Sequence, residues 1–496
     1  MDKIGLLQNI NLGNSVAEFD RNLKDYFVTT PAVLEIVSDR WDIIRGTKGS
    51  GKSAILLTLQ EQTLTLPLLS NTLLVPATNH LGDPVFKTAF SSIELPADQQ
   101  KLIDAWKVYL INVIWPHIKS KFIEDLDIER YLIEKKLITQ PPGLLDKIQF
   151  SLSRIFNPKS IKAAFKDTDG NTYSAETTLQ EETLIEEALP IDFNYIFSTF
   201  EELLLFLELR LWVLMDRLDD AFPGSPELEN AALKALLYAY KDLAGFRQLR
   251  MKIFLRDDIY DRITKDGFRS LTHVNTNAMP PMRWTEEKLL HLVCERLLFN
   301  DCFKEYLTFC GYNFNDFKSN EAREILLLVL FRDQVDIGPK SPTTFRWILN
   351  HVRDGKGNIT PRDVIALIDK ARIDQAEEWS LNLTNTDESY LIGPSSLKSA
   401  WSSVSKDKLE TQLYAEYPHL KNHISSFANG KAEHNATTLR DTLGDNWKES
   451  AEELVNIGFL EKLSGAWKIP FLYREALGIT QGKAFDASSE MEDAVG

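Results

Sequence analysis

Short, continuous apolar runs are the clearest feature of the pattern along this chain. Residues 211–215 form one of them, residues 251–255 form a similar stretch that only Lys252 interrupts, and charged residues follow each stretch at once. Runs of this length are typical of strands buried on both faces of a parallel sheet. Segments 41–45 and 72–76 predict two more strands.

Helical periodicity predicts most of the remaining elements. One apolar face runs from about residue 97 to 119. Further helices share this period and are predicted at 193–207, 284–297, 326–331, 343–352 and 361–371. Thr285 and Thr360 are predicted helix caps, and Pro361 takes a first helical position, where its missing N–H costs nothing.

A glycine-rich segment between the first strand and the next helix carries the most specific chemistry. It fits the phosphate-loop pattern G-x-x-x-x-G-K-[ST]. Its residues are Gly46, Thr47, Lys48, Gly49, Ser50, Gly51, Lys52 and Ser53. Glycines let the backbone turn its N–H groups toward a phosphate, and the helix N-terminus adds a positive dipole. The pattern predicts that ATP binds here with Mg²⁺, the Lys52 amine on its β- and γ-phosphates and the Ser53 hydroxyl on the metal ion.

The acidic end of the run at 211–215 is the second candidate site. Asp216 follows a predicted buried strand, and the carboxyl end of such a strand faces the ligand crevice. We therefore expect Asp216 to be the Walker-B partner of Mg²⁺ and Asp219 or Asp220 to orient the attacking water. Arg217 stands where many related ATPases have a glutamate, so the sequence supports binding more directly than hydrolysis. The alternative is a buried strand with a solvated acidic end.

Two arginines are candidate sensors of the γ-phosphate. Arg256 ends the run at 251–255 and would emerge at the same sheet edge as Asp216 if the strands are parallel. A surface ion pair of Arg256 with Asp257 or Asp258 is the alternative. Arg362 lies at a predicted helix start and could reach back to the phosphates, or it could be a plain surface residue.

These elements predict an α/β fold, a P-loop NTPase with a parallel sheet of the ASCE/AAA+-like type, followed by an α-helical lid and a winged-helix domain. The nucleotide-binding domain is predicted at 1–280, with an insertion at about 120–190, and the lid at 281–400. Residues 401–480 follow a winged-helix order of helix, turn and β-wing. The small, polar residues 481–496 predict a disordered acidic tail.

Composition narrows the choice of partners. The chain has 496 residues, 44% hydrophobic and 26% charged residues, and a formal net charge of −16. This acidic balance argues against a broad grip on nucleic acid, which remains the less favoured partner. The winged-helix segment is itself rich in glutamate, which favours a protein-interaction or autoinhibitory role.

Cysteine usage and apolar run length bear on location. Cys294, Cys302 and Cys310 are spaced by eight residues and would share one side of a continuous helix; the spacing does not favour a metal site. Few cysteines and no secretory signal lead us to expect a cytoplasmic protein. No apolar run approaches the length of a membrane span, so no membrane partner is expected.

Taken together, the marked segments resemble a bacterial group of P-loop ATPases of the AAA+/STAND type. They are the loop at 46–53, the strand ends at 214–219 and 254–257, the segment 360–363 and the wing at 467–470. The strand end also resembles that of KAP-type ATPases, in which Asp-x-x-Asp closes the Walker-B strand; here these are Asp216 and Asp219. The resemblance covers about residues 15–480, without the segment 120–190.

The resemblance implies an ATP-driven switch, commonly in bacterial defence against phage or in other conflict systems. It implies a homo-oligomer and a separately encoded effector protein, since no nuclease, protease or TIR-like segment is recognisable. It makes Asp219 the water-polarising carboxylate, Arg256 sensor-one-like and Arg362 sensor-two-like. Two alternatives stay open: a DNA-associated ATPase that acts through the winged helix, and an ATP-binding scaffold with negligible hydrolysis.

Overall fold

The structure is a computed structural model that describes residues 2–62, 69–77, 98–138, 163–166, 172–175, 190–218, 226–265, 268, 271–381 and 389–485. Its contacts divide the chain into two compact units. Unit 1 contains Met1–Thr30, Thr47–Ala54 and Arg283–Gly496, and unit 2 contains Pro31–Gly46 and Ile55–Met282. Unlike the predicted boundary at residue 280, this division groups the first 30 residues and the glycine-rich loop with the later part of the chain.

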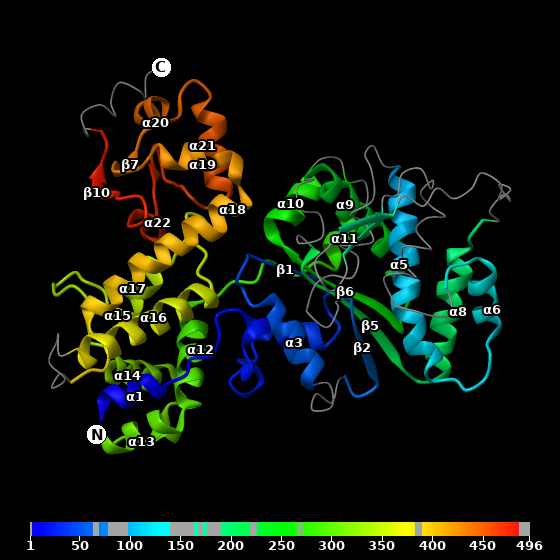
Figure 1. Ribbon diagram of the computed structural model, residues 1–496, viewed down its shortest axis with the longest axis horizontal. Helices are drawn as coiled ribbons and strands as arrows, with labels where there is room; N and C mark the ends of the chain where they lie inside the picture. Colours follow the sequence, from blue (N-terminus) through cyan, green and yellow to red (C-terminus); the bar gives the residue numbers. More distant parts are fainter. Residues whose placement is uncertain are drawn as a thin grey trace. The chain divides into compact units, whose positions relative to one another are not determined.

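A four-stranded parallel sheet forms the centre of unit 2 (Figure 1). Its strands are β1 (Ile43–Gly46), β2 (Thr72–Pro76), β5 (Arg210–Met215) and β6 (Leu249–Arg256). They follow the order β1-β6-β5-β2, and every neighbouring pair is parallel. All four segments that predicted strands are in this sheet, so the predicted parallel α/β fold is confirmed.

The register of the strands brings their carboxyl ends to one edge. Ile253 on β6 lies between Ile43 on β1 and Met215 on β5. Further along, Gly46 at the end of β1 pairs with Arg256 at the end of β6. The glycine-rich loop therefore starts at the sheet edge where β5 and β6 also end.

Helices of unit 2 cover the sheet, and alternate residues of β5 set the contact. Leu211, Val213 and Met215 belong to one buried hydrophobic cluster with residues of α5 (Gln99–Lys119), α8 (Phe193–Phe206) and α9 (Pro226–Leu243). The other helices of the unit are α2 (Pro31–Val37), α3 (Lys52–Gln62), α6 (Asp127–Glu134), α10 (Asp257–Lys265) and α11 (Leu271–Thr276).

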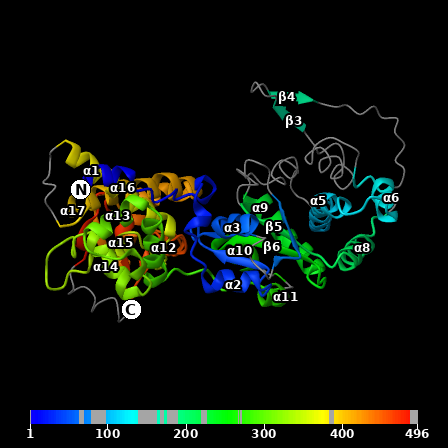
Figure 2. The same cartoon turned by 90° about the horizontal axis from the view of Figure 1, so that it is seen from below.

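The predicted insertion at about 120–190 is described only in part. It includes α6 and an antiparallel pair of strands, β3 (Ala163–Lys166) and β4 (Thr172–Ala175), which Figure 2 labels. A helix and a hairpin are the two kinds of element that its pattern of short apolar pieces and turn residues suggests.

The middle of β6 carries a fully buried lysine, Lys252. Its Nζ donates to Asp39 Oδ1 at 2.5 Å and to Asp42 Oδ1 at 2.8 Å. The same Nζ donates to the carbonyl oxygen of Trp41 and lies 4.4 Å from the ring centroid of Trp212 on β5. Because a buried charge needs groups that replace water, these partners make the position tolerable. They also tie the segment that leads into β1 to the centre of the sheet.

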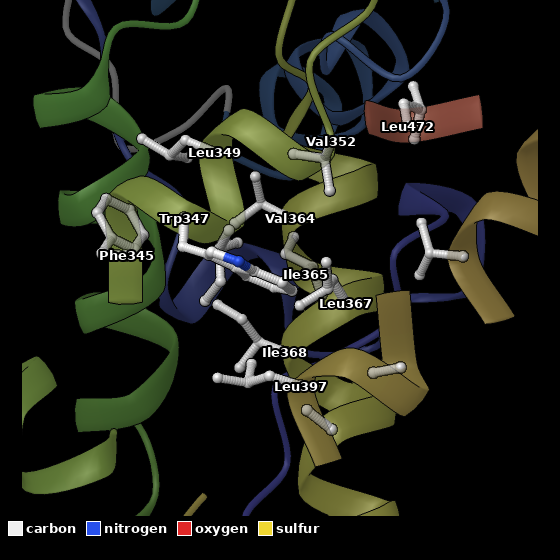
Figure 3. Close-up of a cluster of buried hydrophobic side chains, with 14 of the residues drawn as sticks. Phe345, Trp347, Leu349, Val352, Val364, Ile365, Leu367, Ile368, Leu397 and Leu472 are labelled. Carbon is white, nitrogen blue, oxygen red and sulfur yellow. The ribbon is translucent and has the colours of Figure 1, made fainter. Parts of the chain in front are cut away.

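Unit 1 is mainly helical in its first part. Its helices there are α1 (Lys3–Asn9), α12 (Glu286–Leu298), α13 (Asp301–Phe309), α14 (Asn320–Leu330), α15 (Thr344–His351), α16 (Pro361–Ser380) and α17 (Pro394–Asp407), with 3-10 turns η1 (Ala17–Phe19), η2 (Leu23–Asp25) and η6 (Phe314–Asp316). Figure 3 shows the centre of its core, where Trp347 of α15 lies among aliphatic side chains of α16 and α17.

The N-terminal segment packs against α12. Arg296 on α12 is buried; its Nη2 lies 3.0 Å from Asp20 Oδ2, and its Nη1 donates to the carbonyl oxygen of Leu12. The Tyr26 hydroxyl donates to the other Asp20 oxygen. Gly13 has φ 72°, and a Cβ there would overlap the Tyr26 hydroxyl. The crowding and the left-handed backbone both require glycine.

The C-terminal part of unit 1 shares the same core. The helix α17 crosses the predicted boundary at residue 400 and continues into the π-helix η7 (Lys408–Leu413) and α18 (Tyr414–Glu416). Leu472 of α22 belongs to the same hydrophobic cluster as residues of α15, α16 and α17, and Figure 3 shows it at the edge of the group drawn there. The remaining elements are η8 (Pro418–Leu420), α19 (Lys421–Ser425), β7 (Lys431–His434), α20 (Ala436–Leu443), α21 (Trp447–Asn456), β8 (Glu461–Lys462), β9 (Trp467–Lys468), α22 (Phe471–Arg474) and β10 (Thr480–Lys483).

The second sheet corrects the predicted start of the tail. Its order is β10-β7-β9-β8, and β10 pairs in parallel with β7. Thr480 lies opposite Lys431 and Lys483 opposite Glu433. Residues 481–483 are therefore part of a strand, contrary to the prediction of disorder from residue 481. They pair with the side of β7 that β9 does not occupy. Residues 486–496 lie outside the described residues.

Replacing Lys252 tests the buried ion cluster. We expect Lys252→Met to lower the free energy of unfolding of unit 2 by about 3–5 kcal/mol, because the buried Asp42 and the half-buried Asp39 lose their nearest cation and keep only the more distant Arg250. Lys241→Met on the exposed side of α9 is the control and should change it by less than about 0.5 kcal/mol. Denaturant titration with amide hydrogen exchange of β6 measures both. Equal effects of the two changes would contradict the role given to Lys252.

Candidate phosphate-binding loop and sheet edge

The glycine-rich loop joins β1 to α3. The strand ends at Gly46 and the helix begins at Lys52, as the motif predicts. Gly49 has φ 82° and Gly51 has φ 95°, a left-handed backbone that other residues rarely adopt. The two glycines thus allow the tight turn between strand and helix.

The lysine of the motif lies across its own loop. Lys52 Nζ donates to the carbonyl oxygen of Thr47 at 3.0 Å. Ser53 follows in the first turn of α3, whose N-terminal N–H groups carry a partial positive charge. Lysine amine, helix terminus and glycine turns are therefore gathered within one short segment, an arrangement suited to anions.

Residues from the helical part of unit 1 lie against this loop. The indole Nε1 of Trp284 donates to the carbonyl oxygen of Ser50 at 2.8 Å. A Cβ added to Gly49 would lie 3.1 Å from Arg362 Cβ and 3.2 Å from Thr360 Oγ1. The third and fourth loop positions after Gly46 therefore face the start of α16 and the segment before α12.

The predicted capping of α16 explains how Arg362 reaches this place. Thr360 is the N-cap and its Oγ1 accepts from the backbone N–H of Asp363 at 3.2 Å, with Pro361 in the first turn. Arg362 follows directly. Its Nε is buried and has no hydrogen-bond acceptor among the described residues. A buried guanidinium nitrogen of this kind is suited to an anionic ligand.

Lys48 of the loop forms an ion pair with Glu416 of α18. Lys48 Nζ lies 2.5 Å from Glu416 Oε1, and the side chains are 37% and 14% exposed. The two residues are 368 positions apart in the sequence. The contact places a carboxylate from the C-terminal part of unit 1 at the phosphate-loop lysine.

At the sheet edge, Asp216 follows the last residue of β5 and is 6% exposed. It lies one residue beyond Met215, at the carboxyl end predicted for it. Arg217 next to it has φ 56°. A left-handed conformation costs a residue with a side chain about 1–2 kcal/mol. The turn directly after Asp216 is therefore strained.

Arg256 ends β6 beside Gly46, and Asp258 of α10 binds it. Arg256 Nε donates to Asp258 Oδ1 at 3.0 Å, and Nη2 lies 2.8 Å from Asp258 Oδ2. The ion pair that the sequence left as an alternative is thus formed. The strands are parallel, so Arg256 emerges at the same edge as Asp216, as expected. A role in sensing a phosphate would require Arg256 to exchange this carboxylate for the ligand.

A second arginine at this edge was not singled out from the sequence. Arg45 of β1 lies 2.7 Å from Asp261 and 3.4 Å from Asp257, and its guanidinium lies 3.9 Å from the Tyr260 ring centroid. Burial raises the pKa of Tyr260. These contacts fasten β1 to α10.

Several candidate residues from the sequence analysis are not among those at the loop or the sheet edge. Asp219 and Asp220, the candidates for orienting water, fall outside the described residues. Cys294 and Cys302 lie in different helices, α12 and α13, so the continuous helix considered for the three cysteines is absent between them. Across the described ranges, no group of three or more histidine, cysteine, aspartate or glutamate side chains could hold a metal ion.

The sequence analysis did not predict the contacts of Trp284 and Glu416 with the loop, and the reason is the same for both. Each contacts the loop from a position more than 200 residues away, 234 for Trp284 and 368 for Glu416. Neither belongs to a motif, and no local pattern marks either residue. Only the tertiary structure brings them to the loop.

Comparisons with known proteins give fold-level likenesses of low score. No protein-family model and no curated protein matches this chain. Among solved structures, the Walker-type ATPase PABY2304 of Pyrococcus abyssi is similar with a TM-score of 0.38 and 11% identity, over 95% of this chain and 100% of that chain. The Aeropyrum pernix ORC2 protein, solved as ADPNP–ADP complexes, is similar with a TM-score of 0.33 and 11% identity, over 92% of this chain and 98% of that one. At such scores, function has to be argued from this chain's own residues.

A search for membrane-spanning helices gave a negative result. Within the part of the chain that the structure describes, no helix combines the length and the apolar character needed to cross a bilayer.

Changing Gly49 tests the geometry of the loop. Gly49→Ala is expected to weaken ATP binding about tenfold or more, because the residue is left-handed and its Cβ would press on Arg362 and Thr360. Gly311→Ala is a matched control: Gly311 has φ 87°, but a Cβ there would meet no atom within 4 Å. Titration with a fluorescent ATP analogue measures both. Wild-type affinity in Gly49→Ala would contradict this view of the loop.

Proposed function

We propose that this protein is an ATP-binding and ATP-hydrolysing molecular switch, which converts ATP and water to ADP and phosphate. The observation that carries the proposal is the loop between β1 and α3. It has two left-handed glycines, a lysine lying across it and a helix N-terminus behind it. The buried Asp216 lies at the carboxyl edge of the sheet from which the loop starts.

The residues present fit a triphosphate. Lys52 would bind the β- and γ-phosphates, and the backbone N–H groups from Gly46 to Ser53 would bind phosphate oxygens. The buried Arg362 Nε, without an acceptor among the described residues, supplies a further cationic donor beside the loop. Phosphoryl transfer needs positioning and charge neutralisation above all, and these groups supply both.

The donor set also fits Mg²⁺. The Ser53 hydroxyl and the Asp216 carboxylate are oxygen ligands of the kind that Mg²⁺ prefers. The ion would neutralise charge on the transferred phosphoryl group. Asp219, with Asp220 as the alternative, is our candidate for orienting the attacking water.

The strand order supports the ASCE/AAA+-like assignment. In the order β1-β6-β5-β2, the additional strand β6 separates the loop-bearing strand from the strand that ends in Asp216. Arg256 at the end of this additional strand is our candidate for a sensor-one-like residue, and Arg362 at the start of α16 for a sensor-two-like residue.

Such sensors would make the switch respond to the γ-phosphate. ATP favours one state over another only through contacts that ADP cannot make. Arg256 and Arg362 are the two cations that we propose to distinguish ATP from ADP, since each could bind a γ-phosphate that ADP lacks.

Hydrolysis is the less directly supported half of the proposal. Arg217 occupies the position where many related ATPases have a glutamate. An ATP-binding scaffold with negligible hydrolysis is therefore the main alternative, and a turnover assay with Mg²⁺ distinguishes the two.

The winged-helix assignment of residues 401–480 rests on the order β7, α20, α21, β8, β9. The exposed side of α21 carries Glu449, Glu452 and Glu453 with one lysine, Lys448. Carboxylates repel a phosphate backbone, so this surface favours a protein contact over DNA. A DNA-associated ATPase remains the second alternative.

The finer biological role rests on the sequence resemblance alone. We propose a cytoplasmic homo-oligomer that serves as the ATPase component of a bacterial anti-phage defence or conflict system and controls a separately encoded effector. Loss of phage resistance on deletion of the gene would support this role, and unchanged resistance would remove it.

Lysine replacement in the loop tests nucleotide binding. Lys52→Ala is expected to reduce the affinity for ATP by at least about a hundredfold, because the phosphates lose their main cationic partner. Lys241→Ala is the control and should bind as wild type. A fluorescent ATP analogue titrated with Mg²⁺ gives the affinities, and phosphate release gives the turnover. Undiminished binding by Lys52→Ala would overturn the proposal.

Nucleotide-gated assembly is a separate expectation. We expect the mass of the protein to increase with a slowly hydrolysed ATP analogue but to be the same in the apo and ADP states. Size-exclusion chromatography with light scattering measures this. An unchanged mass in all three states would favour a constitutive scaffold or a partner-dependent ATPase.

A further inference from the structure

The ion pair between Lys48 and Glu416 puts an acidic group where the proposed ligand would also place negative charge. Lys48 lies inside the motif, two residues after Gly46. Its Nζ lies 2.5 Å from Glu416 Oε1, and Glu416 is only 14% exposed. Weak solvation of the carboxylate strengthens such a pair relative to one at a fully exposed surface.

The segment that carries Glu416 also holds the start of α16. Lys408, the first residue of the π-helix η7, lies 2.8 Å from Asp363 Oδ2, and the two side chains are 10% and 9% exposed. The same Asp363 oxygen accepts from Thr360 Oγ1 at 2.8 Å. The stretch from Lys408 to Glu416 therefore contacts the loop in two ways. Glu416 binds Lys48 directly, and Lys408 binds the start of α16, which borders Gly49.

The loop that precedes α16 is joined to the C-terminal part as well. Gly355 N–H donates to the carbonyl oxygen of Gly458 at 2.7 Å, and Lys356 Nζ donates to that of Asn456 at 3.2 Å. A Cβ at Gly355 would overlap the backbone of Leu460. The loop before α16 and the segment 456–460 at the end of α21 are therefore packed backbone to backbone.

Competition for one cation follows from these contacts. A bound triphosphate and the Glu416 carboxylate are both anions, and Lys48 carries a single positive charge. Each therefore weakens the binding of the other, and the coupling is reciprocal. A π-helix is uncommon within a longer helix and often marks a functional segment, which is consistent with movement at 408–416.

We propose that Glu416 is a positioning residue that holds the phosphate loop in a state of low nucleotide affinity by occupying Lys48. Binding of a nucleoside triphosphate exchanges the carboxylate for phosphate and releases α18 from the loop. The C-terminal part of unit 1 is then the part of the switch whose contact with the loop depends on the bound nucleotide. This inference rests on the proposed function, since it requires a triphosphate at the loop.

The test measures affinity in a double-mutant cycle on the full chain. Glu416→Gln should tighten binding of a fluorescent ATP analogue with Mg²⁺ about three- to tenfold, and the gain should shrink as salt rises. Glu410→Gln, an exposed acid in η7, is the matched control and should leave affinity unchanged. In a Lys48→Gln background, Glu416→Gln should give no gain. If Glu416 only stabilised the fold, Glu416→Gln would lower the affinity for the analogue and not raise it.

The outcomes separate the inference from the proposed function. If wild type binds ATP and Lys52→Ala does not, but Glu416→Gln binds no more tightly than wild type, only the inference is overturned. An equal gain in the Lys48→Gln background would also overturn it, because Glu416 would then act elsewhere. If neither wild type nor Glu416→Gln binds the analogue, the proposed function fails and the inference falls with it.

Amide hydrogen exchange gives a second readout. Exchange of residues 408–416 in wild type should rise when the ATP analogue binds, and in Glu416→Gln it should already be high without nucleotide. Unchanged exchange in wild type at saturating analogue would show that α18 is not released, and would overturn the proposal.

Discussion

The parallel pairing of β1 with β6 is the constraint on which the rest of the candidate site depends. It puts the start of the glycine loop beside the end of β6, and β6 in turn aligns β5 and its terminal acid. Lys252 holds this register from inside. Its buried amine binds two carboxylates just before β1. These contacts fix the position of β1 along its neighbour β6. A shift of one residue would separate the cation from both carboxylates and turn every side chain of β1 to the opposite face.

The loop itself depends on a different set of contacts. Its residues cluster with the helical unit, through Trp284, the start of α16 and α18. The strand that supports the loop and the side chains that surround it thus come from distant parts of the chain. A change at the loop would therefore act directly on helices that have no part in the sheet.

Local patterns predicted what local physics determines. The four strands, the caps at Thr285 and Thr360 and the loop between β1 and α3 follow from apolar runs, capping chemistry and glycine spacing. The pairing of Arg256 with Asp258, two residues away, was also foreseeable as an alternative. The contact of Glu416 with Lys48 was not, because nothing near either residue indicates the other. The strand at 480–483 was missed for a similar reason, since its short polar sequence becomes a strand only beside β7.

The anchoring of the N-terminal segment has a consequence for how the chain is made. Leu12 binds Arg296, 284 positions later. At a synthesis rate of about 5–20 residues per second, roughly 15–60 seconds separate the two residues at the ribosome. Leu6, Leu7 and Ile10 are all buried in the folded protein, and α16, the main helix packed against α1, is made later still. Unit 2 can complete its sheet in this interval, whereas the first 30 residues must wait. This segment is therefore translated well before the residues that bury it.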